Sequence, residues 1–127
     1  MEDIVIYKNE KHEMAFEHLY TVGGYATYAV CVKTNYFAGV CNFCIAVETI
    51  NQYTIEINSV IDKLIGGICV RDCESDAYFE MGFNDAKNFV IKGQLGGSHE
   101  INILRFEFSA DQTILYGLKR NLLQYLE

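Results

Sequence analysis

Hydrophobic residues follow two different periods along this chain, and the switches between them constrain the fold more than any other feature. In the segments 14–47 and 77–108, apolar residues recur mostly at every second position, which is the spacing of half-buried β-strands. In the segments 50–64 and 114–125 they recur every three or four positions, which is the spacing of amphipathic helices. The order of strands, helix, strands and helix predicts an α+β domain.

Pairs of small or polar residues separate the predicted strands. They are Gly23-Gly24, Thr34-Asn35, Asn84-Asp85 and Gly96-Gly97. Such pairs are typical of tight turns, and consecutive strands joined by tight turns pair antiparallel. We therefore expect a strongly curved, mostly antiparallel sheet or half-barrel, with a helix packed against its concave side.

One predicted strand changes phase along its length. Ile101 and Ile103 begin it on one parity, whereas Leu104, Phe106 and Phe108 lie on the other. This shift predicts either a β-bulge or a strand that is buried on both faces.

Two amphipathic helices are predicted, at about 50–65 and 110–126. Near each start a Ser or Thr is followed three residues later by Gln, the capping-box spacing in which two side chains satisfy free backbone amides. Gly66 and Gly67 are expected to end the first helix, because glycine accepts the left-handed backbone of a helix C-terminus. The predicted capping-box pairs are Thr49 with Gln52 and Ser109 with Gln112.

Length and composition indicate one soluble domain spanning residues 1–127. Half of the residues are hydrophobic, which is too many for a disordered chain. No apolar run approaches the roughly 20 residues that cross a bilayer. The first residues, Met1 to Ile4, show no basic segment followed by an apolar one, so we expect no export signal and a cytoplasmic location.

The five cysteines predict reduced thiols, because an odd number without an export signal argues against a disulfide framework. Cys41 and Cys44 have redox or zinc spacing, but residues three apart on a strand point to opposite faces. Cys69 and Cys73 lie four apart with no matching histidine. The sequence therefore predicts no metal and no cofactor.

A small hydrolase is an alternative that the sequence leaves open. It requires Ser98 or a cysteine beside a histidine in space, with Asp111 as one candidate acid. Ser98 and His99 are adjacent on the chain and so point apart on a strand, and the nucleophile-elbow motif G-x-S-x-G is absent. The histidines to be placed are His12, His18 and His99. No residue is predicted to be catalytic.

Acidic residues cluster between residues 72 and 85, in a chain whose formal net charge is −7. An acidic surface disfavours nucleic acid and anionic membranes and favours basic partners. Glu80 is expected to project from the strand face opposite Phe79 and Met81. The alternative to a partner-binding role for the acidic cluster is an ordinary solvated rim. The candidate partner-binding residues are Asp72, Glu74, Asp76, Tyr78, Glu80 and Asp85.

Four motifs in the segment 70–126 resemble those of a known family. They are Asp72-Cys73-Glu74-Ser75, Gly93-Gln94-Leu95-Gly96, Asn102-x-Leu104-x-Phe106-x-Phe108 and Asp111-Gln112-Thr113-Ile114-Leu115. In these residues the chain resembles the WapI-like family of bacterial immunity proteins. The first half of the chain is only generically similar.

The resemblance implies a non-enzymatic inhibitor of a contact-delivered toxin. Such a protein binds the C-terminal toxin domain, often a nuclease with a basic cleft, and blocks it sterically in the cytoplasm. The acidic candidates would then pair with Lys and Arg of the toxin, and Tyr25, Tyr36 or Tyr78 would supply an apolar anchor. Two further alternatives stay open: a small-ligand-binding domain with a pocket between sheet and helix, and a homo-oligomer.

Overall fold

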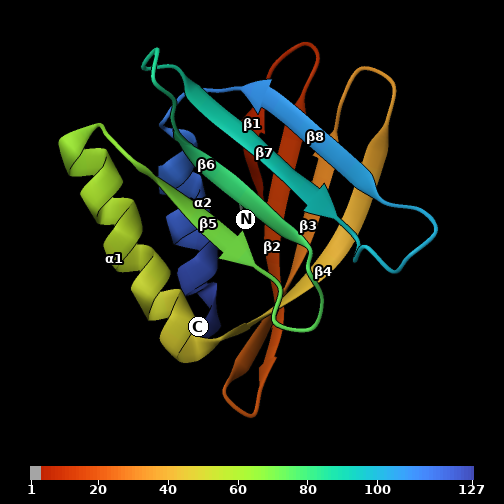
Figure 1. Cartoon of the computed structure of the whole chain (residues 1–127). Coiled ribbons are helices and arrows are strands. Elements are labelled where there is room, and N and C mark those ends of the chain that lie inside the picture. Colours follow the sequence, from red (N-terminus) through yellow and green to blue (C-terminus); the bar gives the residue numbers. More distant parts are fainter. Residues whose placement is uncertain (1–3) are drawn as a thin grey trace.

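The computed structural model describes residues 4–127, so the expectation about an export signal in residues 1–3 lies outside it. Two antiparallel four-stranded sheets form the scaffold (Figure 1). Sheet A contains β1 (Val5–Lys8), β2 (Glu13–Val22), β3 (Tyr25–Lys33) and β4 (Ala38–Ala46). Sheet B contains β5 (Gly67–Arg71), β6 (Tyr78–Phe83), β7 (Phe89–Leu95) and β8 (Leu104–Ser109). The helices are α1 (Val47–Lys63) and α2 (Ile114–Leu122), and a 3₁₀ turn, η1 (Leu123–Leu126), follows α2.

The predicted α+β class, with antiparallel strands and two helices, is confirmed. Where the sequence predicts one curved sheet or half-barrel, the structure has two separate sheets that do not close into a barrel. The division follows from α1, because a helix of 17 residues leads the chain away from β4 before β5 begins. The chain therefore builds four strands and a helix twice in succession.

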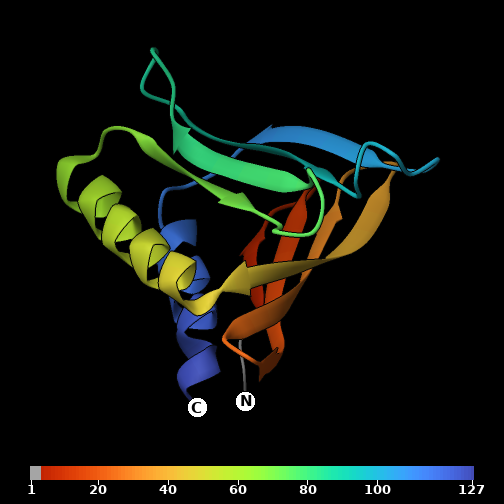
Figure 2. The ribbon, with the colours of Figure 1, turned by 60° about the horizontal axis from the view of Figure 1, so that its bottom comes forward.

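The two sheets form a wedge whose open side is filled by both helices (Figure 2). Helix α2 packs on β1 and β2 of sheet A, and α1 packs beside β5 of sheet B and against α2. Helix α2, from the end of the chain, therefore contacts the first sheet, while α1 contacts the strand that follows it; these contacts tie the two halves of the chain into one unit.

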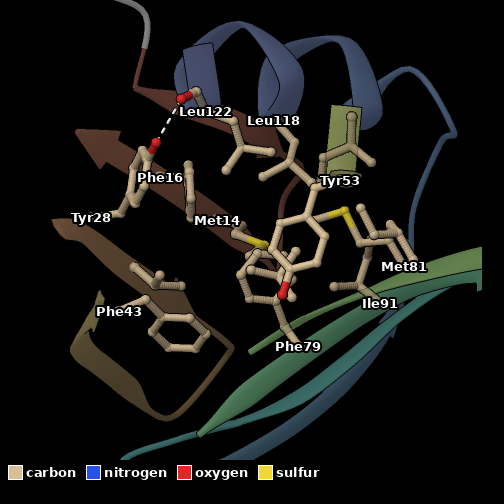
Figure 3. Packing of buried hydrophobic residues seen from close by; sticks show 14 of the residues in the cluster. Met14, Phe16, Tyr28, Phe43, Tyr53, Phe79, Met81, Ile91, Leu118 and Leu122 are labelled. Atoms are coloured by element: carbon tan, nitrogen blue, oxygen red, sulfur yellow. Dashed lines mark hydrogen bonds between the residues drawn. The ribbon is translucent and has the colours of Figure 1, made fainter. Parts of the chain in front are cut away.

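Aromatic side chains fill the centre of the wedge (Figure 3). Phe16 stacks on Tyr28 with ring centroids 4.7 Å apart, and Phe79 of sheet B meets Phe16 edge-on at 5.9 Å. The Tyr28 hydroxyl donates a 2.6 Å hydrogen bond to the Leu122 carbonyl at the end of α2. This bond satisfies the phenol, and burial raises the pKa of Tyr28.

The predicted turns are confirmed, but the predicted strand start at Ile101 is wrong. Residues 96–103 form a loop, β8 begins at Leu104, and the side chain of Ile101 is 96% exposed. The change of phase is therefore neither a bulge nor a strand buried on both faces. Within β8, Phe106 and Phe108 keep one phase and are buried.

The predicted capping boxes are also wrong. Helix α1 starts at Val47, directly after β4, and its first amide donates to the Gly24 carbonyl at 3.0 Å. A carbonyl of the β2–β3 turn thus satisfies the free amide that a side-chain cap was expected to satisfy. Helix α2 starts at Ile114, after a turn in which the Asp111 carboxylate accepts from the Thr113 amide at 3.0 Å.

The first helix ends earlier than its glycines predict. Leu64 takes the left-handed conformation, with φ of 54°, and its amide donates to the Val60 carbonyl at 2.8 Å. Gly66 also has a positive φ, of 81°, and Gly67 opens β5.

Candidate functional site

A groove of about 550 Å³ lies where the β3–β4 turn meets the β7–β8 loop. One wall is formed by residues 37–41 and the other by residues 95–104, and we call this feature the junction groove. Its lining includes the apolar side chains of Phe37, Val40 and Ile103. The β3–β4 turn and the β7–β8 loop lie at one end of the wedge, where β4 of sheet A approaches β7 of sheet B (Figure 2).

Large apolar side chains on and beside the first wall are exposed to solvent. Tyr36 is 86% exposed and Phe37 is 67% exposed in the β3–β4 turn, and Val40 is 69% exposed at the start of β4. The turn that carries the aromatic pair is fixed, because the Thr34 amide donates to the Phe37 carbonyl at 2.7 Å. A surface that is already ordered loses less entropy when it binds a partner.

The charges around the junction groove are acidic. Among its lining residues, all in the described part of the chain, there is no Lys or Arg, while Glu100 belongs to the lining. His99 lies beside this carboxylate, with Nε2 3.2 Å from Glu100 Oε1. The neighbouring β5–β6 loop adds Glu74 and Asp76, both exposed. The groove therefore combines apolar walls with an acidic rim.

Asp76 joins the two loops at this rim. The Ser98 amide donates to Asp76 Oδ1 at 2.7 Å, and the Ser98 hydroxyl donates to Oδ2. The same hydroxyl accepts from Gln94 Nε2 at 3.3 Å, which connects the loops to β7. The loop that carries His99 and Glu100 is thus anchored to the β5–β6 loop.

The link between Asp76 and Ser98 is expected to persist in mildly acidic solution. The hydrogen bond from the Ser98 hydroxyl and then that from its amide hold the pKa of Asp76 below its usual value of 3.8. Because the folded-state pKa is the lower one, the stabilisation is complete above the unfolded-state pKa and is lost as pH falls through the folded-state value. An NMR titration of the carboxyl carbon is expected to place the Asp76 midpoint below 3.8, and Ser98→Ala is expected to raise that midpoint. A wild-type midpoint at or above 3.8 would contradict this assignment.

Asp72, the first acid of the predicted patch, is buried and has a structural role. Its Oδ1 accepts from the Cys44 amide of β4 at 2.9 Å and from the Glu74 amide at 3.3 Å. Its Oδ2 accepts from the Ser75 hydroxyl at 2.6 Å, and the residue is only 8% exposed. The carboxylate ties the β5–β6 loop to the edge of sheet A and does not face solvent.

The remaining predicted residues lie on different parts of sheet B. Tyr78 and Glu80 project from the outer face of β6, and Glu80 points away from the buried Phe79 and Met81, as predicted. Asp85 lies in the β6–β7 turn, at the opposite end of β6 from Asp76. Since β6 has six residues, this places Asp85 roughly 20 Å from the loop acids at ~3.3 Å per residue. The structure brings together Glu74, Asp76 and the nearby Tyr78, but not Asp85.

The two other tyrosines considered as anchors lie far apart. Tyr36 flanks the junction groove, whereas Tyr25 lies at the other end of β3, in the exposed tip of the β2–β3 hairpin. Only Tyr36 is therefore placed to act together with the acidic rim.

A second hollow, of about 540 Å³, lies on the outer face of sheet B. Strand register places Glu80, Lys92 and Glu107 in one cross-strand row along it. Gly67 and Gly82 form part of its floor, where a Cβ added to Gly67 would lie 2.8 Å from the Gly82 Cα. Its charges are of both signs, and neither this hollow nor the junction groove opens between a sheet and a helix.

The residues considered for hydrolysis have other partners. Ser98 is bonded to Asp76 and Gln94, and within residues 4–127 no histidine is its hydrogen-bond partner. His12 stacks on Phe108 with ring centroids 4.6 Å apart, and His18 Nε2 lies 2.7 Å from Thr21 Oγ1 at the exposed end of β2. In residues 4–127 the geometry therefore does not assemble the Ser98–histidine pair, which is one of the two forms of the hydrolase alternative.

Sequence reasoning missed the junction groove. Its usable signal was the pair Tyr36-Phe37 inside a tight turn, where aromatic residues have no core to enter. Ile101 carried a second signal, but the alternation around it suggested a strand. The meeting of the two loops is a tertiary contact that neither pattern contains.

Comparison with protein-family models, curated proteins and solved structures finds no match to this chain in any of the three. The resemblance to WapI-like immunity proteins therefore stays a prediction that rests on the quoted motifs. Within residues 4–127, the helices are too short or too polar to cross a bilayer.

Proposed function

We propose that this chain is a non-enzymatic immunity protein that binds the C-terminal domain of a contact-delivered toxin and blocks it sterically. The observation that carries the proposal is the junction groove, where exposed apolar side chains of the β3–β4 turn lie near exposed acids. The motifs of the segment 70–126 and the net charge of −7 support the same interpretation.

The groove has the features of a protein-docking surface. Aromatic side chains such as Tyr36 and Phe37 supply large contact areas at low cost in side-chain entropy, and they are frequent among the residues that dominate binding energy. Isolated exposed apolar residues are common, but Tyr36, Phe37 and Val40 lie within five residues of one another on one side of the groove.

The acidic rim would select the partner. Glu74 and Glu100 are exposed and carry like charge on neighbouring loops. Charges of one sign raise the encounter rate with a basic surface and disfavour acidic competitors. A nuclease cleft is basic because it binds phosphate, so a bound acidic protein would cover the surface that the toxin's substrate needs.

Co-expression tests the proposal. The chain is produced with the toxin C-terminal domain encoded immediately upstream of its gene, and growth and co-purification are measured. We expect growth to be rescued and a complex to form, with an affinity that falls as salt rises. Growth arrest without a complex would overturn the proposal for that toxin.

A matched charge change separates the role of the rim from the role of the fold. Glu74→Lys combined with Glu100→Lys is expected to weaken the complex about tenfold, since each exposed pair is worth up to ~1 kcal/mol. Asp85→Lys, at the far end of β6, is expected to change affinity less than twofold. Equal losses of affinity in both variants would indicate that the interface lies away from the groove.

Self-association is the alternative that the same surface allows. Burial of Tyr36 and Phe37 against a second copy would give a concentration-dependent mass in size-exclusion chromatography. A constant monomer mass together with toxin binding is the result that the proposal predicts.

A further inference from the structure

Two cysteines from different halves of the chain lie side by side. Cys44 belongs to β4 of sheet A, and Cys73 lies in the β5–β6 loop of sheet B. The Cys73 amide donates to the Cys44 carbonyl at 3.0 Å, and the Cys44 amide donates to the Asp72 carboxylate at 2.9 Å. A backbone–backbone bond and a bond from the Cys44 amide to the Asp72 side chain therefore fix their relative position.

This backbone arrangement suits a covalent bridge. The single backbone bond brings the two residues into direct contact, with the Cys73 nitrogen 3.0 Å from the Cys44 carbonyl oxygen. Disulfides span Cα separations of about 4.4–6.8 Å, so closing a bridge here requires little backbone movement.

The side chains face each other and are reachable from solvent. Phe43 and Ile45 point into the core, so Cys44 lies on the outer face of β4, where it is partly exposed. Cys73 is exposed, and its thiol lies close enough to the Cys44 thiol to raise the pKa of Cys44. Cys41, by contrast, packs against the core on the opposite face of β4, as its spacing from Cys44 predicts.

We propose that Cys44 and Cys73 are an oxidative modification site that closes reversibly to a disulfide. The oxidant is a low-molecular-weight disulfide of the glutathione class. The Cys73 thiolate attacks one sulfur of the oxidant, forms a mixed disulfide and releases one thiolate. The Cys44 thiolate then attacks Cys73 Sγ, closes the bridge and releases the second. The protein loses two protons and two electrons, and the oxidant becomes two thiols.

The order of attack follows from the surroundings of Cys44. Desolvation, then the neighbouring Cys73 thiol and the nearby acids Glu74 and Asp72, raise the pKa of Cys44 to about 12. Cys44 is thus mostly a neutral thiol near neutral pH and suits the second, intramolecular step. The exposed Cys73 meets the oxidant first. In a reducing compartment the pair stays open, which agrees with the reduced thiols that the composition predicts.

The bridge would tie sheet B to the edge strand of sheet A. It would add a covalent link to the contact that Asp72 already makes between the two sheets. It would also hold in place the β5–β6 loop, which carries Glu74. Closing the chain segment between Cys44 and Cys73 into a loop is expected to raise the melting temperature by about 5–10 °C. This inference does not depend on the identity of a partner.

The test is oxidation of the native protein in oxidised glutathione, followed by thiol blocking and mass spectrometry of unreduced peptides. We expect one internal bond, between Cys44 and Cys73, and its loss on reduction. Cys44→Ser is expected to stop at the glutathione adduct on Cys73, and Cys73→Ser is expected to give no internal bond. Cys69→Ser, a change at a partly exposed cysteine of β5, is expected to leave the yield unchanged.

Two results would overturn the inference. One is a wild-type protein that accumulates only the Cys73 adduct although circular dichroism shows it folded. The other is cross-linking that engages Cys31, Cys41 or Cys69 as readily as Cys44.

Discussion

Replacing Asp72 by alanine is expected to lower the free energy of unfolding by about 3 kcal/mol, because the change removes charge-assisted hydrogen bonds and leaves partly buried donors unsatisfied. The lost partners are the amides of Cys44 and Glu74 and the hydroxyl of Ser75. Of these, the Cys44 bond connects the two sheets, so the loss affects the joint between the halves. Urea denaturation measures the effect.

Glu74→Ala is the matched control for this change. Glu74 is an acid in the same loop, but it is exposed. Its replacement is expected to change the unfolding free energy by less than about 0.5 kcal/mol. Similar losses in the two variants would mean that Asp72 is one more surface acid, and the structural role assigned to it would be wrong.

Replacing both Tyr36 and Phe37 by alanine is expected to weaken toxin binding by about 100-fold, because aromatic anchors contribute several kcal/mol where an interface excludes water. The two side chains are 86% and 67% exposed in the free protein, so their loss removes little from the core. The melting temperature of the double variant is expected to stay within about 2 °C of the wild type. Isothermal titration calorimetry with the purified toxin domain measures the affinity.

The control for this prediction is Tyr25→Ala, at the tip of the β2–β3 hairpin. Tyr25 is also a largely exposed tyrosine, with 49% of its surface accessible, but it lies at the other end of β3. Its replacement is expected to leave affinity within about twofold of the wild type. A larger loss at Tyr25 than at Tyr36 and Phe37 would place the docking surface on the hairpin.

Local periodicity predicted the elements well because most of them have one buried face. The alternation of Phe79 and Met81 with Glu80 correctly gave the orientation of β6. The alternation through residues 101–108 predicted a strand start at Ile101 that is wrong, because Ile101 is apolar without being buried. Burial of a residue depends on what lies opposite it, and the sequence pattern does not contain that partner.

The helix starts also depend on hydrogen-bond partners that the local sequence pattern does not contain. The capping-box spacing at Thr49 describes a local way to satisfy free amides, but Val47 instead uses the Gly24 carbonyl, which is distant in sequence. The division into two sheets was likewise missed, since tight turns predict which strands are neighbours and not where a sheet ends.

The acidic candidates were found by composition, and only tertiary structure distinguishes their roles. Asp72 is buried and hydrogen-bonded, Asp76 is exposed but hydrogen-bonded to Ser98, and Glu74 and Asp85 are exposed. In the sequence these four residues are equivalent members of one acidic stretch. The apolar half of the candidate site comes from loops that are far apart along the chain, so it had no single motif to reveal it.

Hydrogen–deuterium exchange on the complex with the co-encoded toxin domain tests the central claim most directly. The account predicts that binding slows exchange in residues 34–41 and 96–104, which form the two walls of the junction groove, and in the adjoining loop 72–77. Protection confined to the β2–β3 hairpin or to the outer face of sheet B, with the groove unchanged, would contradict it.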